Sequence, residues 1–142
     1  MIQKTHAQHA PGIYALELES FSDPWSLDAI LYEIENSVCL VAIKENTVLG
    51  HVTMRHILDE GHINNIAVKK DARQNGIGTK LLEALITEAK KNGITAITLE
   101  VRISNTPALS LYKKHSFEIH GYRKNYYSHP TEDAAIMWKK LF

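Results

Sequence analysis

The most informative segment of the chain reads Val68-Lys69-Lys70-Asp71-Ala72-Arg73-Gln74-Asn75-Gly76-Ile77-Gly78-Thr79-Lys80. It leads from an apolar strand pattern through a polar turn into a helical pattern. Two nucleotide motifs fail here. A P-loop requires Gly-Lys followed by Ser or Thr, whereas Thr79 precedes Lys80, and a dinucleotide fingerprint requires a third glycine where Leu81 stands. What remains is an Arg-x-x-Gly-x-Gly turn at the start of a helix.

This turn has the composition of an anion site. Glycines let the backbone approach a ligand closely, and the first amides of a helix lack partners within the helix. We therefore expect a diphosphate to bind here, with Arg73 and Lys80 at the rim. The spacing of Gly76 and Gly78 is equally compatible with a plain helix start, so at this point both interpretations stay open.

Outward from the turn, the periodicity of apolar residues alternates between strand and helix. The pattern predicts a helix over 76–91 that ends at Asn92-Gly93, and another from Pro107 capped by Asn105 or Thr106. Upstream it predicts a helix through Ile13, Leu16 and Leu18, and a second helix capped by Ser26. Strands are predicted near 2–5, 38–44, 48–57, 62–68, 96–101, 117–127 and 134–141, with 45–47 as a hairpin turn. The order implies a mixed sheet with helices on its faces. The predicted strand 96–101 is largely apolar, so we expect it to be an interior strand that is covered on both faces.

The composition is that of an ordinary globular domain. The 142 residues are 44% hydrophobic and 23% charged, with 16 Lys and Arg balancing 16 Asp and Glu. This length favours one domain over residues 1–142. The balanced charge argues against a broad basic face for nucleic acid. No apolar run approaches the ~18 residues of a membrane span, and the start lacks a signal peptide. We expect a cytoplasmic monomer or weak dimer with no membrane or nucleic-acid partner.

Cysteine and histidine give little sign of metal or redox chemistry. Cys39 is the only cysteine and lies in an apolar run, so we expect a buried, reduced thiol. The eight histidines lack cysteine companions and a His-Glu-x-x-His pattern, which predicts no metal site and places them at the surface or rim. No serine nucleophile elbow is present, so a route through a covalent acyl-serine has no support. The histidines are His6, His9, His51, His56, His62, His115, His120 and His129.

Taken with its flanks, the glycine turn resembles the acetyl-CoA loop of the GNAT N-acetyltransferase superfamily. That loop has Gln or Arg, two variable residues, Gly, one variable residue and Gly or Ala, as in Arg73-Gln74-Asn75-Gly76-Ile77-Gly78. Other blocks resemble the RimI-like branch, the bacterial ribosomal-protein-alanine N-acetyltransferases. They are Asp23-Pro24-Trp25-Ser26, Asn65-Ile66-Ala67-Val68, Leu99-Glu100-Val101-Arg102-Ile103-Ser104-Asn105, Leu111-Tyr112 and Arg123-Lys124-Asn125-Tyr126-Tyr127. The resemblance implies the GNAT fold, an α/β (α+β) arrangement of a mixed, mostly antiparallel sheet of about seven strands flanked by about four helices.

The resemblance also implies roles for individual residues. Glu100 matches the family's proton acceptor and Tyr112 its proton donor. One departure is Ser116, where the family usually has glycine; a left-handed backbone there would cost a serine about 1 kcal/mol. The implied acetyl-CoA contacts are the backbone of Ile66, Ala67 and Val68 for the acetyl and pantetheine arm, the loop Arg73, Gln74, Asn75, Gly76, Ile77, Gly78 and Thr79 for the pyrophosphate, and Asn105.

The chemistry of acetyl transfer suits these residues. An α-amine has a reference pKa of ~7.7 to 8.0, so a carboxylate such as Glu100 is a sufficient base. Glu100 stands in an apolar strand, where it either faces a cleft or points to solvent by simple alternation. Tyr112 lies at helical spacing from Ala108, which is also typical of a core aromatic. A backbone amide within 66–68 would polarise the thioester carbonyl if a bulge frees it.

Several functions remain open from the sequence. The leading hypothesis is transfer to the N-terminal α-amine of a protein, with a small-subunit ribosomal protein that begins with alanine as the acceptor implied by the resemblance. The alternatives are a small-molecule amine or lysine acetyltransferase of the same superfamily, and a non-catalytic CoA-binding sensor, against which Glu100 and Tyr112 count. Trp25, Tyr126 and Tyr127 either line the acceptor groove or are hydrophobic cover.

Overall fold

A seven-stranded mixed sheet forms the frame of the molecule in the computed structural model, which describes residues 1–142. The strand order is β1-β2-β3-β4-β5-β7-β6, and every neighbouring pair is antiparallel except β4 and β5. The strands are β1 Ile2–Lys4, β2 Val38–Lys44, β3 Thr47–Ile57, β4 Glu60–Val68, β5 Ala96–Arg102, β6 Glu118–Tyr127 and β7 Glu132–Lys140.

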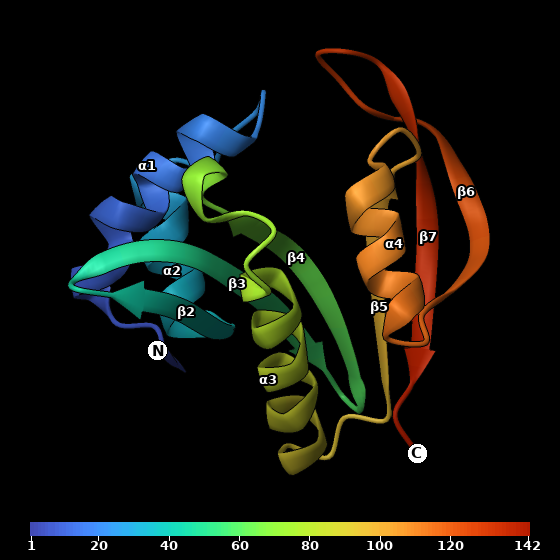
Figure 1. Cartoon of the computed structure of the whole chain (residues 1–142). Helices are drawn as coiled ribbons and strands as arrows, with labels where there is room; N and C mark the ends of the chain where they lie inside the picture. Colours follow the sequence, from blue (N-terminus) through green and yellow to red (C-terminus); the bar gives the residue numbers. More distant parts are fainter.

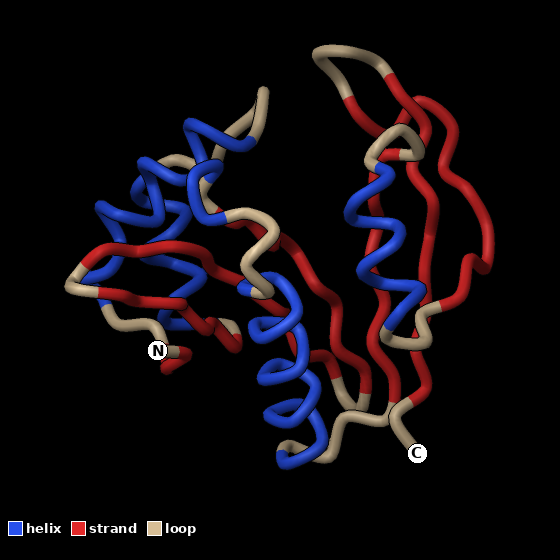
Figure 2. The backbone as a smooth tube through the Cα atoms, viewed as in Figure 1, coloured by secondary structure: helices blue, strands red, loops and turns tan.

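Four α-helices cover the sheet (Figures 1 and 2). Val52 and Met54 of β3 belong to the same core as Leu81 and Leu85 of α3, whereas His51, which precedes Val52, contacts Glu17 of α1. Because strand side chains alternate between faces, α1 and α2 cover one face, and α3 and α4 cover the other. The helices are α1 Ala10–Ser20, preceded by the 3₁₀ turn η1 Ala7–His9, α2 Leu27–Asn36, α3 Ile77–Lys91, preceded by the turn η2 Lys70–Ala72, and α4 Thr106–Lys114.

The local signals in the sequence act as expected. The Ser26 hydroxyl accepts from the Ala29 amide at 3.1 Å and begins α2, and the Asn105 side chain accepts from the Ala108 amide at 3.2 Å and begins α4. These bonds satisfy amides that a helix start leaves free. Glu45 and Asn46 both have positive φ angles, which is the geometry of a tight two-residue hairpin. The predicted mixed, mostly antiparallel sheet of seven strands with four flanking helices is confirmed.

The two halves of the sheet separate between β4 and β5. These strands pair only from Glu60 to Ile63 against Ala96 to Leu99, and beyond that point they diverge (Figure 1). In the β3–β4 pairing, Thr53 lies opposite Asn65 but Met54 lies opposite Ile63, so Asn64 is the extra residue of a β-bulge. The backbone of β4 beyond Ile63 therefore has no strand partner on its β5 side.

Two expectations from the sequence need correction. β5 is fully covered on one face only: Leu99 and Val101 are buried, but Glu100 on the other face is partly exposed because β4 has diverged there. The histidines do not all lie at the surface or rim. His9 and His51 are buried, and burial lowers the pKa of His9.

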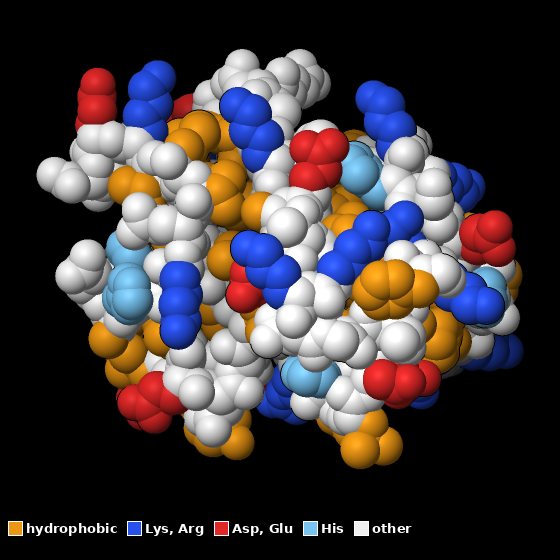
Figure 3. All heavy atoms as spheres, turned by 90° about the horizontal axis from the view of Figure 1, so that it is seen from below, with side chains coloured by type: hydrophobic (Ala, Val, Ile, Leu, Met, Phe, Trp, Pro, Cys, Tyr) orange, Lys and Arg blue, Asp and Glu red, His pale blue; other side chains and the backbone are white.

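The expectations for Cys39 and Ser116 hold. Cys39 is buried, and burial, with Glu33 nearby, raises the pKa of its thiol to about 12. Ser116 has a φ angle of 68°, so the position before Phe117 is left-handed as the resemblance suggests. None of the helices combines the length and apolar character that crossing a bilayer requires. Basic, acidic and hydrophobic side chains are interspersed on the face shown in Figure 3.

Candidate active site

The turn between β4 and α3 presents a row of free backbone amides. None of the amides from Gln74 to Thr79, here called the amide row, donates a hydrogen bond within the chain. Gly76 has a φ angle of +76°, which turns the chain into α3 in a conformation that side chains disfavour. The amide row therefore combines unpaired donors with the positive end of a helix, which together bind anions well.

Gly78 leaves space above the amide row. A Cβ added at Gly78 would lie 3.5 Å from Leu111 and 3.8 Å from Val68, both ordinary contacts. Packing within the chain therefore does not demand glycine at this position. The missing side chain instead leaves the helix start open to a bulky anion, so these residues fit a pyrophosphate.

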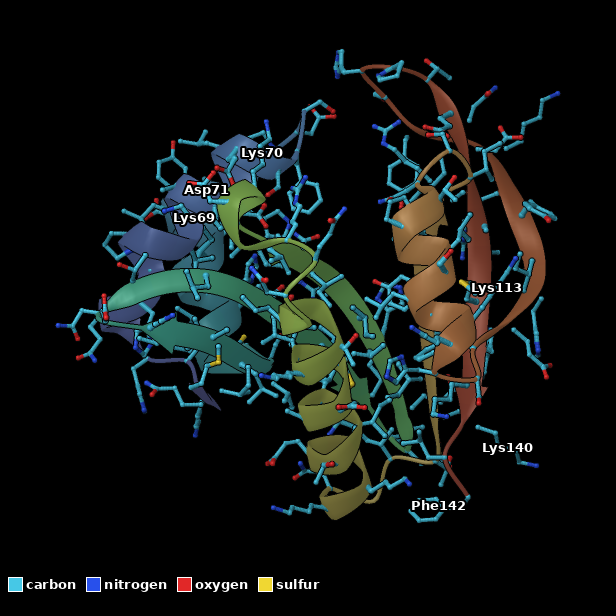
Figure 4. All side chains as sticks on the ribbon, in the orientation of Figure 1. Lys69, Lys70, Asp71, Lys113, Lys140 and Phe142 are labelled. Carbon is cyan, nitrogen blue, oxygen red and sulfur yellow. The ribbon has the colours of Figure 1, made fainter.

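The turn that leads into the amide row is held by two hydrogen bonds. The Arg73 Nε donates to the carbonyl of Val68 at 3.1 Å, and the Lys70 amide donates to Glu19 of α1 at 3.0 Å. Figure 4 shows Lys69, Lys70 and Asp71 on this turn beside α1. Ordering of the turn before a ligand arrives lowers the entropy cost of binding.

A cleft of about 770 Å³ opens where β4 and β5 diverge. Four of the predicted residues line it, namely Ile66, Glu100, Asn105 and Tyr112, and so do Trp25, Tyr126 and Tyr127. Ala67, Val68 and the loop from Arg73 to Thr79 lie outside its lining, further along β4 and into α3. A second cavity of about 580 Å³, between β1, β2, α2 and α3, is lined by none of the predicted residues.

Glu100 lies inside the cleft with its carboxylate held by two donors. Its side chain is 11% exposed. The His62 Nε2 lies 3.0 and 3.1 Å from the two carboxylate oxygens, and the Tyr126 hydroxyl donates to Oε1 at 3.1 Å. Because a carboxylate only accepts hydrogen bonds, His62 must carry its proton on Nε2 here. Burial, together with Glu100, raises the pKa of Tyr126. The sequence pattern did not identify His62 or Tyr126 as partners of Glu100.

Tyr112 reaches the cleft from α4. The residue is 4% exposed and packs edge-on against Phe117, with ring centroids 5.5 Å apart. Its hydroxyl makes no hydrogen bond within the chain, although the residue lines the cleft. Burial, with a smaller contribution from Tyr127, raises the pKa of Tyr112. The phenol is therefore fully protonated at neutral pH and gives its proton only to a strong base nearby.

The wall of the cleft formed by α1 and its following loop is organised by a buried carboxylate. Glu17 is 0% exposed. Its Oε1 accepts from the Trp25 amide at 3.0 Å, and its Oε2 accepts from Asn65 Nδ2 at 2.9 Å and lies 3.0 Å from His51 Nε2. One carboxylate thus joins α1, the α1–α2 loop, β3 and β4. Its position on the same helical face as Ile13 was the signal that could have revealed it.

The opposite wall is held by Arg102 of β5. Its guanidinium donates to Glu132 at 3.2 Å and to the carbonyl of Ser128 at 2.8 Å, and it stacks on the ring of Tyr127 at 4.5 Å. Hydrogen bonds from Ser104 hold the pKa of Glu132 below its usual value. Burial and the neighbouring Tyr126 and Glu100 raise the pKa of Tyr127 to about 12.

The two walls meet at one exposed contact. His129 Nδ1 lies 3.3 Å from Asp23 Oδ2, although the two residues are far apart in the sequence. Both side chains are well exposed, so this contact contributes little stability. The contact marks where the α1–α2 loop and the β6–β7 loop approach each other beside the cleft, which both residues line.

Comparison with known proteins agrees with this arrangement. Residues 10–117 match the model of the Acetyltransferase (GNAT) family. The chain is 35% identical over 132 residues to the [ribosomal protein bS18]-alanine N-acetyltransferase of Escherichia coli, covering 89% of this chain and 88% of that one. A Bacillus subtilis protein that carries the same name provisionally is 37% identical over 129 residues, covering 89% and 85%. The crystal structure of the Escherichia coli ribosomal-protein-S18-alanine N-acetyltransferase superposes with a TM-score of 0.92 at 31% identity, covering 99% of this chain and 93% of that one.

Proposed function

The chain belongs to the GNAT acetyltransferase family and is an acetyl-CoA-dependent N-acetyltransferase, and from this premise we propose that it acetylates the N-terminal α-amine of a ribosomal protein that begins with alanine. The names of its relatives support this acceptor. The observation that carries the proposal is the position of Glu100, which stands in the cleft with its carboxylate held by His62 and Tyr126.

We propose that the donor is bound mainly by the backbone. The amide row, together with Arg73, receives the pyrophosphate of acetyl-CoA, because its donors are unpaired and lie at a helix start. The backbone of Ile66, Ala67 and Val68 then lies along the acetyl and pantetheine arm, where β4 has no partner on its β5 side. Asn105 uses its Oδ1 to cap α4, which leaves its Nδ2 as the group available to the donor.

The proton acceptor in this proposal is Glu100. Bound acetyl-CoA supplies the thioester carbonyl carbon, to which the acceptor nitrogen forms a C–N bond while the C–S bond breaks. The Glu100 carboxylate takes the proton that the nitrogen loses. Free amides of β4 beyond the Asn64 bulge stabilise the negative charge that develops on the carbonyl oxygen.

Tyr112 gives its proton to the departing sulfur. A phenol of reference pKa ~10 is a weaker acid than a thiol of ~8.5, and burial raises the pKa of Tyr112 further. The same water-poor surroundings also make the thiolate more basic, which reduces the difference between the pKa values of the phenol and the thiol. Proton transfer that accompanies C–S cleavage avoids a free tyrosinate. The free hydroxyl of Tyr112 suits this role because no partner within the chain competes for its proton.

We further propose that residues 1–142 form a single catalytic domain that works in the cytoplasm as a monomer or weak dimer. One continuous sheet and a core shared by β3, α3, β5 and α4 support the single domain.

Mass spectrometry of acetylated peptides tests the proposed function. The protein is incubated with acetyl-CoA and peptides that begin with Ala, Ser or Met, alongside peptides with a blocked N-terminus and an internal lysine. We expect the alanine peptide to be acetylated fastest, at its α-amine. Predominant lysine modification would identify a lysine acetyltransferase instead, and CoA binding without transfer to any amine would identify a sensor.

A further inference from the structure

We propose that the Asn65 side chain binds the acceptor amine through its Oδ1, and that the buried Glu17 fixes the orientation in which it does so. This inference rests on the proposed function, because it assigns a contact to the amine that the protein acetylates. Asn65 lies next to the Asn64 bulge on β4 and lines the same cleft as Glu100. Neither Glu17 nor the Asn65 side chain has a role in the proton transfers proposed above.

The orientation of the Asn65 amide follows from its partner. A carboxylate accepts hydrogen bonds and cannot donate them, so the group that faces Glu17 Oε2 at 2.9 Å must be the Nδ2 of Asn65. The Oδ1 is then turned away from Glu17. It accepts no hydrogen bond within the chain and is not among the enclosed polar atoms that lack a partner. Asn65 thus presents a free acceptor to a cleft that it lines.

A free acceptor at this place suits an amine. An α-amine carries only donors when protonated and still offers N–H groups when neutral, and at neutral pH it is a mixture of both forms. Glu100 takes one proton from it in the proposed reaction, so a second acceptor is needed to hold the nitrogen while that proton leaves. An amide carbonyl can do this without competing for the proton.

Glu17 is poorly explained as a device for stability alone. Burying a carboxylate has a desolvation cost, and replacing a buried polar network by apolar residues is often neutral or favourable. The arrangement here also leaves His51 Nδ1 enclosed without a partner, which adds a further cost. Two of the three donors to Glu17, the Trp25 amide and Asn65 Nδ2, belong to residues that line the cleft. The network therefore positions the wall at which the acceptor would bind.

The test measures how much the protein prefers a peptide with an amine over one without. Calorimetry in the presence of CoA gives dissociation constants for an alanine-starting peptide and for the same peptide with propionyl in place of alanyl, which lacks only the amine. We expect Asn65→Leu to reduce this preference about 10-fold, since a hydrogen bond to a charged group is lost. CoA affinity, measured separately, should change less than two-fold.

Two further variants keep the test decisive. Glu17→Gln should reduce the preference about three-fold, because a glutamine can also donate and so no longer dictates how the Asn65 amide lies. Thr53→Val is the matched control: Thr53 pairs opposite Asn65 and has an enclosed, unpartnered hydroxyl, so its loss should leave the preference unchanged. If Asn65→Leu does not fold, Glu17→Gln decides the question.

The outcomes separate this proposal from the one it rests on. A wild-type protein that acetylates the alanine peptide, with an amine preference that Asn65→Leu and Glu17→Gln leave intact, overturns only the role of Asn65. A loss of CoA affinity in step with peptide affinity would also overturn it, because the network would then be a general structural support. A wild-type protein that acetylates no α-amine overturns both proposals.

Discussion

The amide row and the cleft differ in the groups that they offer to a ligand. The amide row is main chain, and its donors from Gln74 to Thr79 are free because a glycine turn begins a helix there. The cleft depends on side chains from several elements, with Glu100 held by His62 and Tyr126. The difference teaches that, in the proposed function, a constant donor is recognised by backbone geometry, whereas recognition of the acceptor is left to replaceable side chains.

The sharpest way to test the comparison is to damage the cleft alone. We expect Glu100→Gln to lower kcat about 1,000-fold at neutral pH, because the general base is lost, while CoA affinity stays unchanged. The defect should shrink as pH rises above the amine pKa of ~8, since the amine then loses its proton to solvent. Stopped-time acetylation assays across pH, with calorimetry for CoA, provide the measurement. A defect of equal size at every pH would exclude Glu100 as the base.

The converse experiment damages the amide row alone. Gly78→Glu places a carboxylate over the proposed pyrophosphate site, and we expect CoA to bind about 100-fold more weakly because like charges repel. A glutamate in the first turn of α3 favours the helix, so the urea midpoint should stay the same or rise. The neutral Gly78→Gln serves as control with a smaller loss of affinity. Equal losses in both variants would mean that bulk, and not charge, matters there.

A third substitution separates catalysis from packing within the cleft. Tyr112→Phe should lower kcat about 10-fold or more, because the departing thiolate loses its proton donor. The ring still packs against Phe117, and the hydroxyl makes no hydrogen bond within the chain, so thermal stability should not fall. Parallel measurement of kcat, CoA affinity and melting temperature checks this. A fall in CoA affinity as large as the fall in kcat would make Tyr112 a structural residue.

The smallest expected effect concerns two left-handed positions. Gly76 begins α3 with a φ angle of +76°, whereas Ser116, after the helix that carries Tyr112, adopts 68° without being glycine. We expect Ser116→Gly to raise the free energy of unfolding by up to ~1 kcal/mol, because the steric cost of the serine Cβ disappears. Gly76→Ala should change it by a similar amount in the opposite direction. Urea denaturation of the two variants measures both changes in the free energy of unfolding. Changes of the same sign would contradict the assigned backbone strain.

The sequence predicted local features, such as helix starts and ends, far better than the contacts of the cleft. The glycine spacing, the cap at Asn105 and the end of α3 at Asn92 are local signals, each readable from a few neighbouring residues. Strand bounds were also close, with β7 beginning at Glu132 and not at Ala134. Local physics decides these features, so a pattern along the chain is sufficient.

The cleft was harder to predict because its contacts join distant residues. Glu17 and His51 lie 34 positions apart, and His62 and Glu100 lie 38 apart. A histidine on its own favours the surface, and only a partner from another element makes burial of His51 acceptable. Trp25, Tyr126 and Tyr127 stayed undecided between groove and cover for the same reason, and the structure places all three along the cleft.

The divergence of β4 from β5 has a consequence for the stability of the folded protein. In the proposed function the donor binds in that opening, and any molecule that binds only the folded state shifts the unfolding equilibrium by mass action. At a concentration 100 times its dissociation constant, such a ligand contributes about 2.7 kcal/mol. The fraction of folded protein in a cell would then depend on the concentration of its own donor. A fall in that concentration would lower the amount of folded enzyme as well as its rate.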